Sequence, residues 1–147
     1  MRIREIGPGE THLAFTAMRE LRTHLSDVSA FARHVDEQQR GHGYRLAGAF
    51  DDAPVAVAVA GFRVAQNLAW GRHVYVDDLS TLPPARRRGY ARALLDWLAE
   101  EGRRMGCGEL HLDSGVGPQR ADAHRLYLNA GLTITSHHFS RPLPDPA

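Results

Sequence analysis

Three consecutive arginines and a glycine stand directly before an apolar helical pattern, in the stretch LPPARRRGYARALLDWL of residues 82–98. The aligned peptide dipoles and unpaired N–H groups of a helix N-terminus make it partly positive, so cations at Arg86, Arg87 and Arg88 are unfavourable there. A bound anion removes the conflict, and Gly89 lets the backbone approach that anion closely. The stretch therefore predicts a site for a ligand that carries phosphate groups.

The alternative is a solvated cluster of surface arginines with no ligand, because a short arginine and glycine pattern is weak by itself. The context favours the phosphate site, since an irregular strand, a proline-rich turn, the basic turn and an amphipathic helix follow in that order. A Walker motif fits less well, because no lysine followed by serine or threonine comes after the glycine. The further glycines of a dinucleotide fingerprint are also missing.

Two adjacent carboxylates interrupt the strand pattern GRHVYVDDLSTL of residues 71–82, in which the apolar alternation is broken before Leu79. One inserted residue, a β-bulge, restores the alternation and opens a gap in the hydrogen-bond ladder. Asp77 and Asp78 are carboxylates that can accept a proton or attract a cation. Neighbouring strand residues point to opposite faces unless the bulge intervenes, so we expect at most one of them, Asp78, to line a site.

The histidines and the single cysteine favour neither a metal site nor a covalent mechanism. His137 and His138 are neighbours on one expected strand, and His111 and Asp113 lack a third ligand. His138 is kept as a candidate that faces a substrate, although a structural histidine is the commoner outcome. Cys107 is the only cysteine, which excludes an internal disulfide, and it has no evident activating partner.

Periodicity and turn residues predict the elements that position these groups. The order is a strand, two helices, three strands, a helix, a strand, a helix and one or two final strands, which indicates an α+β or mixed α/β fold with helices on a central sheet. The expected segments are strands at 1–6, 44–50, 55–64, 71–82, 109–116 and 132–143, and helices whose apolar faces span 14–25, 28–35, 91–105 and 123–130, the second of them capped by Ser26 or Asp27.

Composition predicts one soluble domain over residues 1–147, with a loose tail at about 142–147. The chain has 147 residues, of which 43% are hydrophobic, and a formal net charge of +1. So balanced a charge argues against a protein that coats nucleic acid or an anionic membrane. Neither a secretory signal nor a run long enough to span a bilayer is present, so we expect a cytoplasmic protein.

Two blocks of this sequence resemble the GNAT superfamily of acyl-CoA-dependent N-acetyltransferases. Arg86, Gly89 and Ala91 match its signature of glutamine or arginine, two residues, glycine, one residue, and glycine or alanine. The preceding YVDDLSTLPP is similar to the family's bulged fourth strand, and AHRLYLNAGL at residues 123–132 is similar to a second block. Leu132 replaces the common phenylalanine there.

The resemblance implies a central mixed, mostly antiparallel sheet of six to seven strands, with about four flanking helices. It also implies that acetyl-CoA binds and that CoA is a product. Arg120 stands where the family often has an asparagine, which is a departure from the family pattern at a position implied to contact the middle of that molecule. The implied binding residues are Leu79, Ser80, Thr81, Arg86, Arg87, Arg88, Gly89, Tyr90, Ala91, Ser114, Arg120, Ala123 and Tyr127.

By the same resemblance, a primary amine of a small molecule or peptide attacks the acetyl carbon directly. Tyr127 is then the acid that protonates the leaving sulfur, and Asp78 is the candidate that accepts the amine proton. The candidate substrate-binding residues are Asp77, Asp78 and His138, and a homodimer is expected by resemblance only. The alternative is a CoA- or nucleotide-binding or protein-interaction module without turnover, for which Tyr127 would be dispensable.

Overall fold

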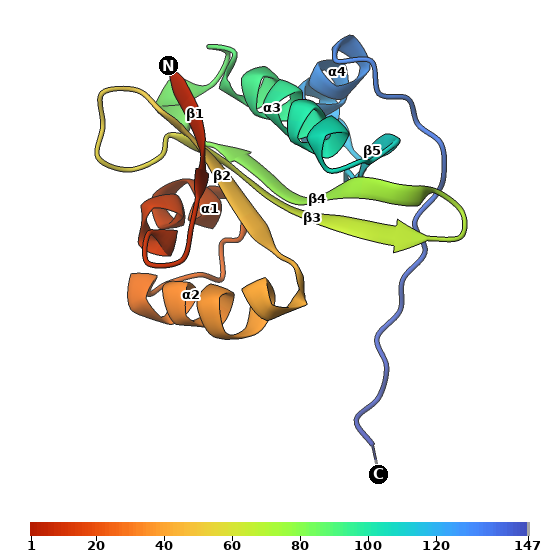
Figure 1. Ribbon diagram of the computed structural model, residues 1–147, viewed down its shortest axis with the longest axis horizontal. Coiled ribbons are helices and arrows are strands. Elements are labelled where there is room, and N and C mark those ends of the chain that lie inside the picture. The colour runs from red at the N-terminus through yellow and green to blue at the C-terminus, as the bar shows by residue number, and fades with distance from the viewer. Residues whose placement is uncertain (147) are drawn as a thin grey trace. The chain divides into compact units, whose positions relative to one another are not determined.

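The computed structural model describes residues 1–146, which form two compact units, residues 1–112 and residues 113–146. The first unit holds the whole sheet. The strands are β1 (Arg2–Ile6), β2 (Arg45–Phe50), β3 (Ala58–Asn67), β4 (Gly71–Thr81) and β5 (Glu109–Leu112). They lie in that order, as Figure 1 shows; the first four are antiparallel neighbours, and β5 pairs parallel to β4.

The mixed α+β class and the mostly antiparallel sheet are therefore confirmed, but the expected number of six to seven strands is wrong. The sheet has five strands. The expected final strand or strands at 132–143 are absent from the described residues.

The first unit packs its helices on both faces of this sheet (Figure 1). On one face, α1 (Phe15–Leu21) and α2 (Val28–His34) bury aromatic and aliphatic side chains against β1, β2 and β3. The Asp27 side chain caps α2 by accepting a hydrogen bond from the Ala30 N–H, which satisfies one of the unpaired donors of the first turn. The large side chains of this cluster include Ile6, Phe15, Met18, Phe31, Tyr44, Leu46 and Phe50.

On the other face, α3 (Tyr90–Arg104) buries Leu94, Leu95 and Leu98, as its apolar periodicity predicted. The helix approaches β4 closely, since a Cβ added at Gly102 would lie 2.7 Å from Val74 Cγ2. The shorter helical turns of the first unit are Thr11–Ala14, Val35–Gln39, Arg40–His42 and Pro83–Ala85.

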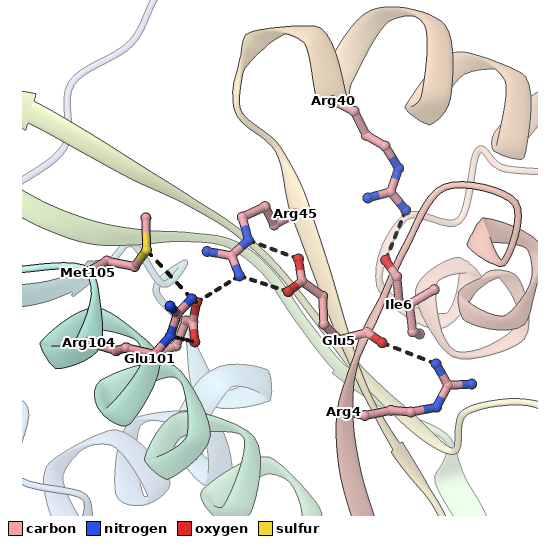
Figure 2. A network of polar contacts seen from close by, with 8 residues as sticks. All are labelled: Arg4, Glu5, Ile6, Arg40, Arg45, Glu101, Arg104 and Met105. Carbon is pink, nitrogen blue, oxygen red and sulfur yellow. Dashed lines mark hydrogen bonds and ion pairs between the residues drawn. The ribbon is translucent and has the colours of Figure 1, made fainter.

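An ion network joins β1, β2 and α3, as Figure 2 shows. Arg45 donates to both carboxylate oxygens of Glu5, at 2.9 and 2.8 Å, and to Glu101 Oε1 at 2.8 Å. Arg104 donates to the same Glu101 carboxylate. These two arginines together lower the pKa of Glu101 to about 2, and they outweigh the opposing effect of burial.

The outer strand β1 carries its arginines over an aromatic ring. The guanidinium of Arg4 lies 4.6 Å, and that of Arg2 5.6 Å, from the centroid of the Phe50 ring on β2. This geometry is typical of cation–π contacts. It holds two positive charges along the edge of the sheet.

The second unit contains the turn Pro118–Arg120 and the helix α4 (Ala121–Asn129). Residues 132–146 form no helix or strand, and Ile134, Phe139 and Leu143 are exposed. A strand gains its backbone hydrogen bonds from a neighbouring strand. Residues 113–146 contain no strand that could be such a neighbour, so the alternating segment LTITSHHF remains irregular. The expected tail at 142–147 is irregular as far as residue 146, and residue 147 lies outside the described residues.

Candidate functional site

A β-bulge lies in β4 where the broken alternation predicted it. Gly61 on β3 pairs with Asp78, and the next residue, Phe62, pairs with Val76, so Asp77 is the extra residue. The bulge separates two halves of the strand. It directs the neighbouring carboxylates of Asp77 and Asp78 toward different partners.

Asp78 lies at the centre of a hydrogen-bonded group on the first unit. Tyr44 donates its hydroxyl to Asp78 Oδ2 at 2.7 Å, and Arg22 donates Nε–H to Asp78 Oδ1 at 2.8 Å. Only 12% of the Asp78 side chain is exposed. Gly61 makes room for this pair, because a Cβ at that position would lie 1.9 Å from the Tyr44 hydroxyl and 2.6 Å from Asp78 Oδ2.

Asp77 pairs instead with Arg63, which donates Nε–H to Asp77 Oδ2 at 2.9 Å. Burial raises the pKa of Asp77 above its ordinary value, and Arg63 opposes that rise. Arg63 also donates to the His42 carbonyl at 3.0 Å and to Gln39 Oε1 at 2.6 Å. Each of the two carboxylates is thus ion-paired with an arginine of the same unit.

The outer edge of β4 is open beyond the bulge. β5 pairs only with His73–Val76, so within residues 1–112 no strand pairs with that edge at residues 77–81. The other edge is occupied, because Leu79, Ser80 and Thr81 pair with β3. The Ser80 hydroxyl is buried and donates to the Ala17 carbonyl at 2.7 Å, so this side chain is directed to α1. The gap presents backbone groups to which an extended amide chain can pair as a strand does.

The basic turn enters α3 through two residues of positive φ. Arg87 has φ +62° and Gly89, the N-cap, has φ +86°, and no side chain caps the helix. A non-glycine residue in this region is uncommon and marks a site that is held by its surroundings. Nothing lies within 4 Å of a Cβ built at Gly89, so the backbone here faces open space. The turn and the first N–H groups of α3 therefore fit a phosphate group.

Two of the arginines have contacts with neighbouring elements but remain well exposed. Arg86 donates to the Thr81 carbonyl at 3.4 Å, and Arg88 donates to Asp51 Oδ2 at 3.2 Å. Both side chains are 58% exposed. A guanidinium group that is positioned by one hydrogen bond and still exposes other N–H donors can bind phosphate oxygens.

Tyr90, a predicted ligand contact, is buried at the start of α3, and its hydroxyl donates to Asp51. That hydrogen bond lowers the pKa of Asp51 and raises the pKa of Tyr90. Asp51 was not among the predicted site residues, because the only feature that marks it in the sequence is its place in the acidic turn DDAP.

In the second unit, Arg120 joins two of the other predicted residues. It donates to Ser114 Oγ at 3.4 Å and lies beside Tyr127. Burial raises the pKa of Tyr127, and Arg120 opposes that rise. His138 Nδ1 lies 3.6 Å from Asp113 Oδ1, with both side chains largely exposed, and Ala123 lies in the first turn of α4.

No group of three histidine, cysteine, aspartate or glutamate side chains among residues 1–146 is arranged to hold a metal ion. In the same part of the chain, none of the helices has the length and apolar character needed to cross a membrane.

The bulged strand, its open edge and the glycine turn at the start of α3 occur in the order expected from the resemblance. The family model described as the acetyltransferase (GNAT) family matches residues 13–132. The chain belongs to this family. The match spans most of the chain and includes both sequence blocks, so acetyl transfer is the general activity that membership supports.

Individual relatives agree with this GNAT assignment. The chain is 32% identical over 131 residues to the uncharacterized N-acetyltransferase YhdJ of Bacillus subtilis (strain 168), which covers 88% of this chain and 89% of YhdJ. The structure of AAC(6')-Iy in complex with a CoA bisubstrate analogue has a TM-score of 0.82 at 18% identity, with 97% of each chain covered. Glucosamine-6-phosphate N-acetyltransferase from Arabidopsis thaliana has a TM-score of 0.76 at 16% identity, covering 97% and 98% of the chains. The two solved structures establish the likeness of fold.

Proposed function

We propose that this GNAT protein is a single-domain N-acetyltransferase that moves the acetyl group of acetyl-CoA to a primary amine by direct attack. The observation that carries the proposal is the open edge of β4 at residues 77–81, followed within a few residues by the glycine turn at the start of α3. An extended amide chain and a phosphate group need these two features in this order. The CoA portion of AAC(6')-Iy's bisubstrate analogue agrees with a CoA-binding role in the family.

The binding of the donor is assigned to three sets of groups. The backbone of Leu79, Ser80 and Thr81 pairs with the pantetheine amides. The N–H groups from Arg86 to Ala91 hold the pyrophosphate, with the guanidinium groups of the turn beside it. In the second unit, Ser114, Arg120 and Ala123 contact the remainder of the molecule.

The reaction forms one bond and breaks another. When bound, acetyl-CoA supplies an activated acetyl group as a thioester. The neutral amine nitrogen bonds to the acetyl carbon while the bond from that carbon to sulfur breaks, and the electron pair of that bond leaves with the sulfur. Tyr127 donates its phenol proton to the sulfur, and Asp78 accepts the proton of the amine nitrogen through water.

The surroundings of the two catalytic residues support these roles. The pKa of Tyr127 is raised by burial, so the phenol keeps its proton at neutral pH and is able to donate it. Asp78 accepts hydrogen bonds from Tyr44 and Arg22, which fix the orientation of its carboxylate beside the open edge of β4. His138, with Asp113 beside it, is a further candidate to contact the acceptor.

Calorimetric titration with acetyl-CoA tests the donor site. The unmodified protein is compared with Gly89→Glu, which places a carboxylate at the turn, and with Gly71→Glu as the matched control. Gly71 also has positive φ and open space around it, but it lies in the β3–β4 hairpin. We expect binding that Gly89→Glu abolishes and Gly71→Glu retains. Equal binding by all three would remove the glycine turn from the site, and binding without transfer to any amine would leave a CoA-binding module.

A further inference from the structure

Arg22 directly follows α1 and lies beside the bulge of β4. Its backbone N–H closes the last turn of that helix by donating to the Met18 carbonyl. Its side chain donates Nε–H to Asp78 Oδ1 at 2.8 Å and Nη2–H to the Asp77 carbonyl at 2.9 Å. The guanidinium plane is therefore fixed by two bonds to consecutive residues of β4, directly before the open edge.

The two bonds leave part of this guanidinium available. A guanidinium has five N–H donors, and Arg22 uses one at Nε and one at Nη2. Its other three donors have no hydrogen-bond partner among residues 1–146, and 44% of its side chain is exposed. Water satisfies such donors until a ligand replaces it.

Arg63, the second arginine of the bulge, shows the contrasting arrangement. It donates from all three of its nitrogens, to Asp77, His42 and Gln39, and only 26% of its side chain is exposed. Arg63 thus donates from every nitrogen of its guanidinium. Arg22 likewise donates Nε–H to an aspartate of the bulge, but its Nη1 group makes no hydrogen bond within residues 1–146.

The charges at the bulge also oppose the expectation of a cation-attracting acidic pair. Asp78 is paired with Arg22 and Asp77 with Arg63, so an incoming acceptor meets a guanidinium edge in place of two unpaired carboxylates. A cation that approached Asp78 would have to displace Arg22 from two hydrogen bonds. A carboxylate or phosphate oxygen would add to Arg22 without breaking either bond.

We propose that Arg22 is an acceptor-binding residue and that the amine acceptor carries an anionic group, a carboxylate or a phosphate, which the free Nη1 edge of Arg22 binds. This inference rests on the proposed function. Arg22 then determines specificity, while the fixed position of its guanidinium on Asp78 and the Asp77 carbonyl spares the ordering of a mobile side chain on binding.

Acetyl transfer to matched pairs of primary amines tests this. The pairs are glycine and glycinamide, β-alanine and β-alaninamide, and phosphoethanolamine and ethanolamine, each compared by the ratio of kcat/KM for the anionic member to that for the neutral one. The enzyme is compared with Arg22→Gln and Arg22→Lys. Arg19→Gln is the control, since Arg19 lies one turn earlier on α1, is exposed and packs its guanidinium over Phe15. Because all variants meet the same amines, differences in amine reactivity cancel in the comparison.

We expect the anionic member to be preferred in at least one pair and Arg22→Gln to lower that ratio about ten- to a hundredfold, mainly through KM. Arg22→Lys keeps part of the preference, and Arg19→Gln keeps all of it. The pair that shows the effect tells a carboxylate from a phosphate. An unchanged ratio in Arg22→Gln, or transfer to the neutral members alone, would overturn the proposal while leaving acetyl transfer intact. Failure to bind acetyl-CoA would overturn this inference and the proposed function together.

Discussion

Tyr44 donates its hydroxyl to Asp78 across the bulge at 2.7 Å, and the two residues meet over a glycine. Burial, together with the adjacent carboxylate, raises the pKa of Tyr44 well above its usual range, so the phenol stays a donor at every pH at which the protein is handled. The pair fixes the orientation of Asp78 from one side, and Arg22 fixes it from the other.

Gly61→Ala should separate this pair. The new methyl group would lie 1.9 Å from the Tyr44 hydroxyl, so Tyr44 must move, and we expect the free energy of unfolding to fall by about 1–3 kcal/mol. Urea denaturation measures this. Gly41→Ala is the control, since a Cβ there meets nothing within 4 Å. Equal stability of Gly61→Ala and the unmodified protein would show that the bulge adapts without cost.

Glu101 should make the protein sensitive to acid. Its pKa in the folded protein is about 2, below the ordinary value of 4.5, so its contribution to stability is fully present above pH 4.5 and is lost as the pH falls toward 2. Thermal unfolding from pH 6 to pH 2.5 should therefore show a smaller loss of Tm with acid in Glu101→Gln than in the unmodified protein. Glu100→Gln serves as the control, because the Glu100 side chain is 77% exposed. Parallel curves for the two variants would contradict the assignment.

Tyr127→Phe tests the proposed role of Tyr127 as the acid that protonates the leaving sulfur. The change removes only the hydroxyl, so we expect kcat to fall about 10²-fold or more while the calorimetric affinity for acetyl-CoA changes little. The effect should be smaller with a synthetic thioester whose thiol is more acidic, since that leaving group needs less protonation. Full activity of Tyr127→Phe would assign Tyr127 to packing.

Cys107→Ala should be harmless to turnover. Cys107 follows the end of α3, and its backbone N–H donates to the Gly102 carbonyl at 2.8 Å, a bond that alanine keeps. Steady-state kinetics with the best acceptor should give an unchanged kcat. An inactive variant that still binds acetyl-CoA would point to an acetyl-cysteine intermediate.

Local signals in the chain predicted much of the first unit. Gly89 and the apolar periodicity predicted α3, which runs from Tyr90 to Arg104. The broken alternation before Leu79 predicted a bulge, which the structure has at Asp77. The side chain of Asp27, a residue type typical of helix N-caps, caps α2. These features depend on residues within one or two turns of each other, which is why a single sequence reveals them.

The partners of the carboxylates were not predictable in this way. Tyr44 is 34 residues, and Arg22 is 56 residues, from Asp78, and neither spacing has a pattern. The prediction of a final strand was wrong for a related reason. Alternation at residues 132–139 indicates a tendency toward extended backbone, but it does not show that a partner strand is present. The residue assignments for acetyl-CoA and the acceptor stay predictions.

The arginines of β1 bear on how the protein behaves when it is concentrated. An exposed sheet edge is a template on which other chains can add strands and aggregate, and positive side chains along it make such addition unfavourable. Arg2 and Arg4, held over Phe50, give β1 this protection at one margin of the sheet. The first strand thus acts as a barrier to uncontrolled polymerisation in addition to its part in the core.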